Sequence, residues 1–85
     1  MSIRLTILSE IERVAAEQHR TLAPLTDSLT LLESGLDSLC FAILVARLED
    51  TLGFDPFNTA EDVYFPITLG DLIKFYESAA EHAAT

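Results

Sequence analysis

Apolar residues recur at helical spacing in separate segments of this 85-residue chain, and this pattern restricts its fold more than any other feature. Near the N-terminus they follow the offsets 0, 1, 4, 7 and 8, which make one face of a helix: Ile7, Leu8, Ile11, Val14 and Ala15. In the middle of the chain they follow the offsets 0, 3, 4, 7 and 11: Phe41, Leu44, Val45, Leu48 and Leu52. No segment shows the alternation typical of a strand, so we expect an all-α fold.

Turn and capping residues predict the ends of the first two helices. The first helix is expected over residues 3–18. Residues 19–37 lose the helical period and contain a proline, which predicts a long connection. The second helix begins near Ser38, with Asp37 or Ser38 as its N-cap, and ends before Gly53, a residue suited to a helix C-terminus. The leucines of the connection are expected to lie across the core: Leu22, Leu25, Leu29, Leu31 and Leu32.

Two further pairs of capping residues predict the remaining helices. These pairs have the spacing of a capping box, with aspartate in the place of glutamate: Thr59 with Asp62, and Thr68 with Asp71. The first pair predicts a short third helix over residues 60–64, and the second a fourth helix over 69–80. We therefore expect a single domain over residues 1–85: a four-helix bundle with a long first connection and a short third helix.

Charge and cysteine content exclude several classes of function. Five basic and 14 acidic residues give a net charge of −9, which argues against nucleic acid or an anionic membrane as partner and favours a basic protein surface. The single cysteine, Cys40, cannot form an internal disulfide, and with only two histidines no metal site is expected. The longest uncharged run, residues 38–46, is far shorter than the roughly 20 residues that span a bilayer. These features predict a monomeric cytoplasmic domain.

The chain shows no arrangement of residues typical of an enzyme. Its three glycines are isolated from one another, so there is no phosphate-binding glycine loop. The carboxylates are spread over solvated helix faces, and His19 and His82 lie at predicted helix ends, where a cation is favourable without any catalytic role. We therefore expect no catalytic residue.

The segment Gly35-Leu36-Asp37-Ser38-Leu39 stands at the predicted start of the second helix. A serine at a helix start is usually a cap and nothing more. However, unpaired backbone N–H groups and the positive end of the helix dipole would also stabilise a phosphate ester on this hydroxyl. Gly35 would allow a sharp turn just before it, and Leu36 and Leu39 would point inward, leaving Ser38 outward. The segment is therefore a candidate attachment point for a phosphate-linked group.

At these residues the chain resembles the acyl carrier protein family, whose hallmark is Asp-Ser-Leu at the start of the second of four helices. Length, acidity and the predicted order of helices extend the resemblance over nearly the whole chain. The resemblance implies that Ser38 carries a 4′-phosphopantetheine arm, installed from coenzyme A by a phosphopantetheinyl transferase with magnesium. It also implies that Asp37 and Leu39 belong to the attachment motif, that the thiol of the arm holds an acyl group as a thioester, and that the domain itself catalyses nothing.

The resemblance places partner enzymes with basic patches on the second helix. The residues expected at this surface are Cys40, Ile43, Arg47, Glu49 and Asp50. Cys40 and Ile43, expected on the solvent side, make the early part of this surface more apolar than is typical of the family. Two interpretations remain open: a few exposed apolar residues without a function, or an apolar patch for specialised partners.

In the family, a cleft between the second and third helices can shelter an acyl chain. By that resemblance, the residues that could line it here are Val45, Leu48, Phe54, Phe57 and Phe65. The alternative interpretation is that these side chains simply pack the core. Bulky rings in such a cleft would favour short or polar cargo.

The resemblance leaves three functions to be compared. The first is a carrier of acyl groups in fatty-acid, polyketide or specialised lipid synthesis. The second is a carrier of aminoacyl or peptidyl units in nonribosomal synthesis; Asp37 before the serine favours the first, because peptidyl carriers more often have glycine or histidine there. The third is an acidic helical adaptor in which Ser38 is only a cap.

Overall fold

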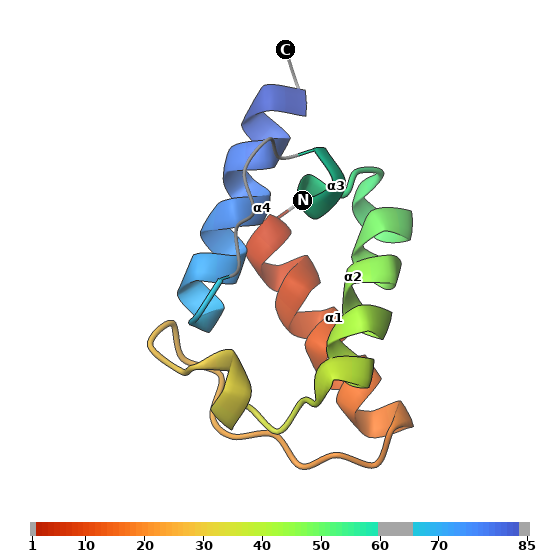
Figure 1. Cartoon of the computed structure of the whole chain (residues 1–85), viewed down its shortest axis with the longest axis vertical. Helices are drawn as coiled ribbons and strands as arrows, with labels where there is room; N and C mark the ends of the chain where they lie inside the picture. The colour runs from red at the N-terminus through yellow and green to blue at the C-terminus, as the bar shows by residue number, and fades with distance from the viewer. Residues whose placement is uncertain (1, 60–65, 84–85) are drawn as a thin grey trace.

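The computed structural model describes residues 2–59 and 66–83, and in these ranges the protein is all-helical (Figure 1). The elements in chain order are α1 (Ile3–Glu17), the 3₁₀ turn η1 (Leu31–Glu33), α2 (Ser38–Leu52), α3 (Pro56–Thr59) and α4 (Leu69–Ala83). The described ranges contain no strand, only an isolated antiparallel bridge between Thr30 and Thr68. The prediction of an all-α fold is confirmed.

Side-chain caps define where the long helices begin, and glycine defines where α2 ends. The Ser2 hydroxyl accepts a hydrogen bond from the backbone N–H of Leu5 at the start of α1. At the start of α4, Thr68 and Asp71 form the predicted capping box, in which each side chain accepts from the backbone N–H of the other, at 3.1 and 3.3 Å. Gly53 ends α2 with a φ of 85°, as predicted for a left-handed C-terminal residue.

The short helix α3 begins at Pro56. Proline is favourable at the first position of a helix, because its missing N–H has no intrahelical partner there. The Asp55 carboxylate accepts a hydrogen bond from the backbone N–H of Phe57, at 3.0 Å, which stabilises this first turn. The short helix predicted over residues 60–64, with Asp62, lies outside the described residues, whereas Thr59, expected to cap that helix, is the last residue of α3.

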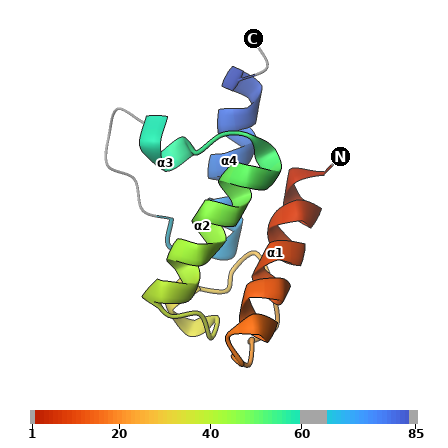
Figure 2. The ribbon, with the colours of Figure 1, turned by 90° about the vertical axis from the view of Figure 1, so that its right-hand side faces the viewer.

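The core lies between α1, α2 and α4. Figures 1 and 2 show α1 and α2 side by side with opposite chain directions, and Figure 1 shows α4 on the other side of α1 from α2. The apolar faces of these three helices supply the largest fully buried aliphatic side chains: Ile7, Ile11, Val14, Leu44, Leu48, Leu69, Leu72 and Ile73. Each such side chain contributes about 1.5–3 kcal/mol when it is removed from water. No helix within the described ranges is both long and apolar enough to cross a membrane.

The connection between α1 and α2 is held against the start of α4 by backbone hydrogen bonds. Leu31 N–H donates to the Ile67 carbonyl, and Leu69 N–H donates to the Leu29 carbonyl, both at 2.9 Å. Leu22, Leu25 and Leu31 pack against the core, as predicted for this connection. The prediction is wrong for Leu32, which is 96% exposed, because the turn η1 directs it outward.

Tyr76 of α4 lies in the core with its hydroxyl unsatisfied. Its side chain is fully buried, and its Oη has no hydrogen-bond partner among the described residues. Burial raises the pKa of the Tyr76 phenol far above its usual value, and the nearby Asp55 and Glu49 carboxylates raise the pKa further. The phenol is therefore neutral at neutral pH.

We expect Tyr76→Phe to stabilise the protein, because the variant keeps the ring and removes a buried hydroxyl that has no partner. The expected gain in the free energy of unfolding is about 1 kcal/mol, measured by urea denaturation at pH 7. A loss of stability of similar size would show that the hydroxyl has a hydrogen-bond partner in solution.

Candidate functional site at the start of α2

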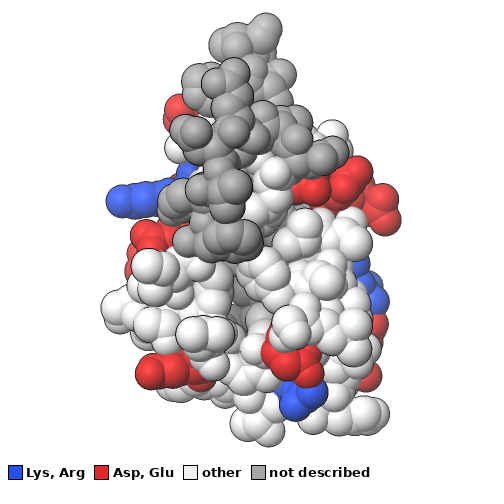
Figure 3. Space-filling view, viewed as in Figure 1, with Lys and Arg blue, Asp and Glu red and all other residues white. Residues whose placement is uncertain are grey.

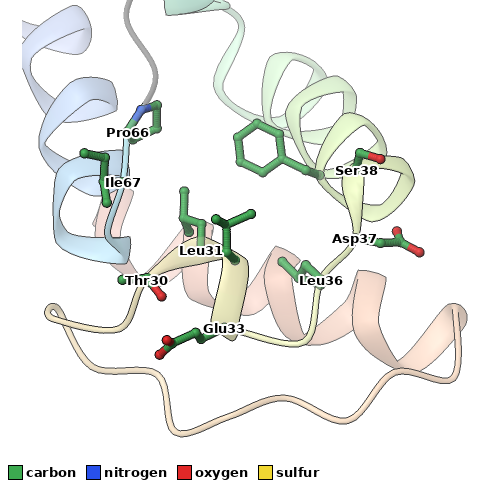
Figure 4. Close-up of a pocket in the computed structure, with 10 residues that line it drawn as sticks. Thr30, Leu31, Glu33, Leu36, Asp37, Ser38, Pro66 and Ile67 are labelled. Carbon is green, nitrogen blue, oxygen red and sulfur yellow. The ribbon is translucent and has the colours of Figure 1, made fainter.

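The first turn of α2 presents Ser38 to solvent. Asp37, not Ser38, is the N-cap: its φ is −92°, and its Oδ1 accepts a hydrogen bond from the Cys40 N–H at 2.8 Å. Ser38 is therefore the first residue of the helix, it is exposed, and its hydroxyl points away from the bundle (Figure 4). A side chain that is not needed as the cap leaves its oxygen available for covalent attachment.

Gly35 makes the turn that leads into this site. Its φ is 103°, in the left-handed region that favours glycine, and a Cβ at this position would lie 2.2 Å from the Thr21 carbonyl oxygen. The buried Ser34 hydroxyl stabilises the same turn: it donates to the Leu31 carbonyl at 2.6 Å and accepts from the Leu36 N–H at 3.3 Å. The backbone of the first connection and the start of α2 are thus held in contact.

Asp37 also forms an ion pair with Arg20, which follows the C-terminus of α1. This arginine was not singled out in the sequence, because residues 20 and 37 come together only when the ends of α1 and α2 meet. The pKa of the Asp37 carboxyl is held below its usual value, first by the hydrogen bond from Cys40 and further by the charge of Arg20. Asp37 is therefore ionised at neutral pH.

The lowered pKa of Asp37 predicts that the pair is lost in acid. A carboxyl whose pKa is lowered in the folded state binds fewer protons there than in the unfolded state. Its contribution to the free energy of unfolding is therefore complete above the unfolded pKa of about 4, and is lost as the pH falls through the folded pKa. Asp37→Asn keeps a capping side chain and removes the charge. We expect wild type to be more stable than this variant at pH 7 and the difference to shrink at pH 3, in urea denaturation. A difference that stays constant would contradict the predicted ionisation.

An apolar pocket of about 540 Å³ adjoins Ser38. It lies between η1, the first turns of α2 and the segment before α4 (Figure 4). Among the residues that line the pocket, only Glu33 and Asp37 carry a carboxylate. Apart from Ser38, the remaining lining residues are Thr30, Leu31, Leu32, Leu36, Phe41, Pro66 and Ile67. Ile67 is 69% exposed, so apolar surface continues from the pocket to its rim. The sequence did not indicate this pocket, since its walls come from two segments that are distant along the chain, residues 30–41 and 66–67.

The structure reverses the predicted orientations of Leu39 and Cys40. Cys40, expected on the solvent side, is 1% exposed, whereas Leu39, expected to point inward, is 61% exposed. The reason is that Cys40, Leu44 and Leu48 follow one another at intervals of four residues, and this row faces the core. The adjacent Leu39 lies about 100° around the helix and faces solvent. Cys40 is therefore excluded from the partner surface.

The other residues expected at the partner surface of α2 differ in their exposure and in their contacts. Glu49 and Asp50 are exposed, and Ile43 is partly buried against the core. Arg47 makes a two-pronged ion pair with Glu17 of α1, with one Nη1–Oε2 contact of 2.9 Å. This pair raises the pKa of Arg47 and lowers that of Glu17, and it joins α1 to α2. Acidic charge therefore predominates at the C-terminal end of the exposed face.

The residues expected to form an acyl cleft do not line the pocket beside Ser38. Leu48 is fully buried, Val45 is partly buried, and Phe65 lies outside the described residues. Phe54 and Phe57 pack against Tyr76, with ring centroids 6.1 Å apart in both pairs. In the described part of the chain, these rings belong to an aromatic cluster that also includes Phe41 of α2, whose ring centroid lies 6.2 Å from that of Phe57.

No group of three or more potential metal ligands occurs among the described residues. His19 is exposed at the end of α1. The polar chemistry of the site therefore consists of the Ser38 hydroxyl, the Asp37 carboxylate and the Arg20 guanidinium.

Comparison with known proteins gives one family match. The family described as "phosphopantetheine attachment site" matches residues 5–75, which include the whole of the first connection and α2. No curated protein and no solved structure matches the chain.

Proposed function

Because the chain belongs to the family of phosphopantetheine attachment domains, we propose that it is an acyl carrier protein and that Ser38 is its attachment residue. The observation that carries this proposal is an exposed serine hydroxyl at the first residue of α2, beside a neighbour that caps the helix in its place. The domain is the site of covalent attachment of 4′-phosphopantetheine. When it is bound, the arm supplies a thiol that holds an acyl group as a thioester.

The residues around Ser38 fit a phosphate ester. The ester oxygen would lie at the N-terminal end of a fifteen-residue helix, whose first backbone N–H groups and dipole favour a negative charge. Gly35 and Ser34 hold the preceding turn, so the attachment point keeps its position when the arm is loaded. The role of the chain itself is to present the cargo; we propose that it catalyses no step.

The surface charge supports transient association with basic partners. All four arginines are paired with carboxylates, in the pairs Arg4–Asp27, Arg13–Glu10, Arg20–Asp37 and Arg47–Glu17. With Lys74 as the fifth basic residue, the uncompensated charge is overwhelmingly negative. Figure 3 shows carboxylates around a largely uncharged face. Complementary charge accelerates encounter without requiring tight binding, as a carrier that serves several enzymes needs.

We propose that the partner surface combines Leu39 and Ile43 with Glu49 and Asp50 along the exposed face of α2. Leu39 is 61% exposed next to the attachment residue, which favours an apolar contact with partners over an exposed residue without function. The partners are a phosphopantetheinyl transferase, with coenzyme A and magnesium, and enzymes that load and process acyl groups. Fatty-acid, polyketide or specialised lipid synthesis would supply such a cargo.

Two further features belong to this proposal. The carrier is a cytoplasmic monomer with four helices, of which α3 is the short third. The aromatic residues Phe54 and Phe57, with Val45 and Leu48, are candidates to receive the end of an acyl chain if Phe57 separates from Phe41 of α2.

The experiment that tests the proposal is intact-mass analysis after incubation with coenzyme A, magnesium and a transferase of broad specificity. We expect a gain of one phosphopantetheine per chain, and fragmentation of the modified peptide should place it on Ser38. An unchanged mass would favour an unmodified adaptor. Release of an aminoacyl group, not an acyl group, from native protein would instead favour the peptidyl carrier.

A further inference from the structure

Arg20 is the basic residue that the fold places beside the attachment segment. Among the described residues, the Arg20–Asp37 ion pair is the only one that involves residues 35–39. The side chains are 46% and 40% exposed, so both can be reached by a group attached at the surface. Figure 1 shows the C-terminal end of α1 and the N-terminal end of α2 at the same end of the bundle.

The backbone after α1 holds Arg20 in this position. His19 has a φ of 56°, in the left-handed region that is uncommon for a residue other than glycine. The N–H of Arg20 donates to the Ala15 carbonyl at 2.8 Å, and the N–H of His19 donates to the Ala16 carbonyl at 3.3 Å. These two bonds are those of a Schellman motif, which closes the helix and turns the chain. These hydrogen bonds therefore fix the position of the Arg20 backbone.

Attachment of the arm changes the charges at this point. The neutral Ser38 hydroxyl is replaced by a phosphodiester with one negative charge, next in sequence to the ionised Asp37. Two neighbouring anions repel each other, and a cation that contacts both offsets this repulsion. A guanidinium has five N–H donors in a planar fork, and the pair with Asp37 uses one terminal nitrogen of Arg20. The remaining donors can bind a phosphate oxygen.

The other three arginines are paired elsewhere, and the lysine lies on another helix. Arg47 lies nine residues beyond Ser38, which is about 13 Å along the axis of α2, and it is paired with Glu17. Arg13 is paired with Glu10 on α1, at 3.4 Å, Arg4 with Asp27, and Lys74 lies on α4. Arg20 is thus the cation that a phosphodiester on Ser38 would meet.

We propose that Arg20 binds the phosphodiester of the loaded arm while it keeps its contact with Asp37, and so sets the direction in which the arm leaves the bundle. This inference rests on the proposed attachment at Ser38. Arg20 is a positioning residue: it orients the arm and takes no part in forming the thioester. If Arg20 only held Asp37 in its capping position, replacing Arg20 would have the same effect on stability with and without the arm.

The test compares modified and unmodified forms of wild type, Arg20→Gln and Arg47→Gln, with modification verified by mass. Arg47→Gln is the matched control, because it also removes the basic partner of a surface ion pair. Modification changes the unfolding equilibrium constant of each protein by some factor. We expect this factor to be about threefold less favourable to the folded state in Arg20→Gln than in wild type. The difference between the two proteins should become smaller in 0.5 M salt. Arg47→Gln should behave as wild type. The ³¹P resonance of the phosphodiester should shift in Arg20→Gln and not in Arg47→Gln.

A measurement on the wild-type protein is independent of these variants. The Arg20 Nε–Hε resonance, assigned by NMR, should shift when the arm is attached, whereas that of Arg47 should not. An unchanged Arg20 resonance, or equal effects of modification in wild type and Arg20→Gln, would overturn the inference even though the mass gain still supports attachment. A wild-type protein that gains no mass would instead overturn the proposed function.

Discussion

We expect the Ser38→Ala variant to gain no phosphopantetheine under conditions in which the wild-type protein gains one. The oxygen that forms the ester is absent from alanine, and the mass is measured on the intact protein after incubation with coenzyme A, magnesium and transferase. The variant should remain folded. Because Asp37 and not Ser38 caps α2, we expect the free energy of unfolding to change by no more than about 0.5 kcal/mol.

Ser28→Ala is the matched control for loading. Ser28 is also an exposed serine of the first connection, but it lies in a turn and not at the start of a helix. This variant should be modified as fully as wild type. Loading of Ser38→Ala at a rate near that of wild type would exclude Ser38 as the attachment residue and would require another serine to be identified by peptide fragmentation.

Gly35→Ala should cost about 3 kcal/mol or more in the free energy of unfolding, the largest stability effect that we predict. Alanine must adopt a φ of 103°, and its Cβ would lie 2.2 Å from the Thr21 carbonyl oxygen, so the backbone of the first connection has to move. Urea denaturation measures the loss. Loading at Ser38 should also be slower, because the displaced turn leads directly into the attachment segment.

Gly53→Ala separates the two causes of this effect. Gly53 also has a left-handed φ, of 85°, but a Cβ there would meet no atom within 4 Å. Its substitution should therefore cost only the conformational penalty, about 1 kcal/mol. If Gly35→Ala proved no more damaging than Gly53→Ala, the close approach to Thr21 would not contribute to stability.

Local features of the sequence were sufficient to predict the three long helices, but not α3. The apolar spacing placed α1 and α2 within one residue of their observed ends, and Thr68 with Asp71 located the start of α4. These predictions succeed because periodicity, capping and glycine at a helix end depend on residues within a few positions of one another. Pro56 was harder to interpret, since proline is as favourable at the start of a helix as it is unfavourable inside one.

The attachment segment was also recognisable from local sequence, but its surroundings were not. Residues 35–39 and their place before an apolar helix are sufficient to identify the motif. By contrast, Leu39 and Cys40 are both apolar residues of one helical turn, and only packing against α1 and α4 decided which of them is buried. A helix with apolar residues on more than one face does not by itself specify its rotation toward the core.

The sequence alone thus determined the three long helices, the acidic surface and the serine at the start of α2, because each depends on composition or on neighbouring residues. The tertiary structure decided the pairing of Arg20 with Asp37, the approach of Gly35 to Thr21 and the pocket between η1, α2 and the segment before α4. Each of these joins segments that are distant along the chain. Their contact depends on how the three long helices pack around a shared core, and no local pattern records that arrangement.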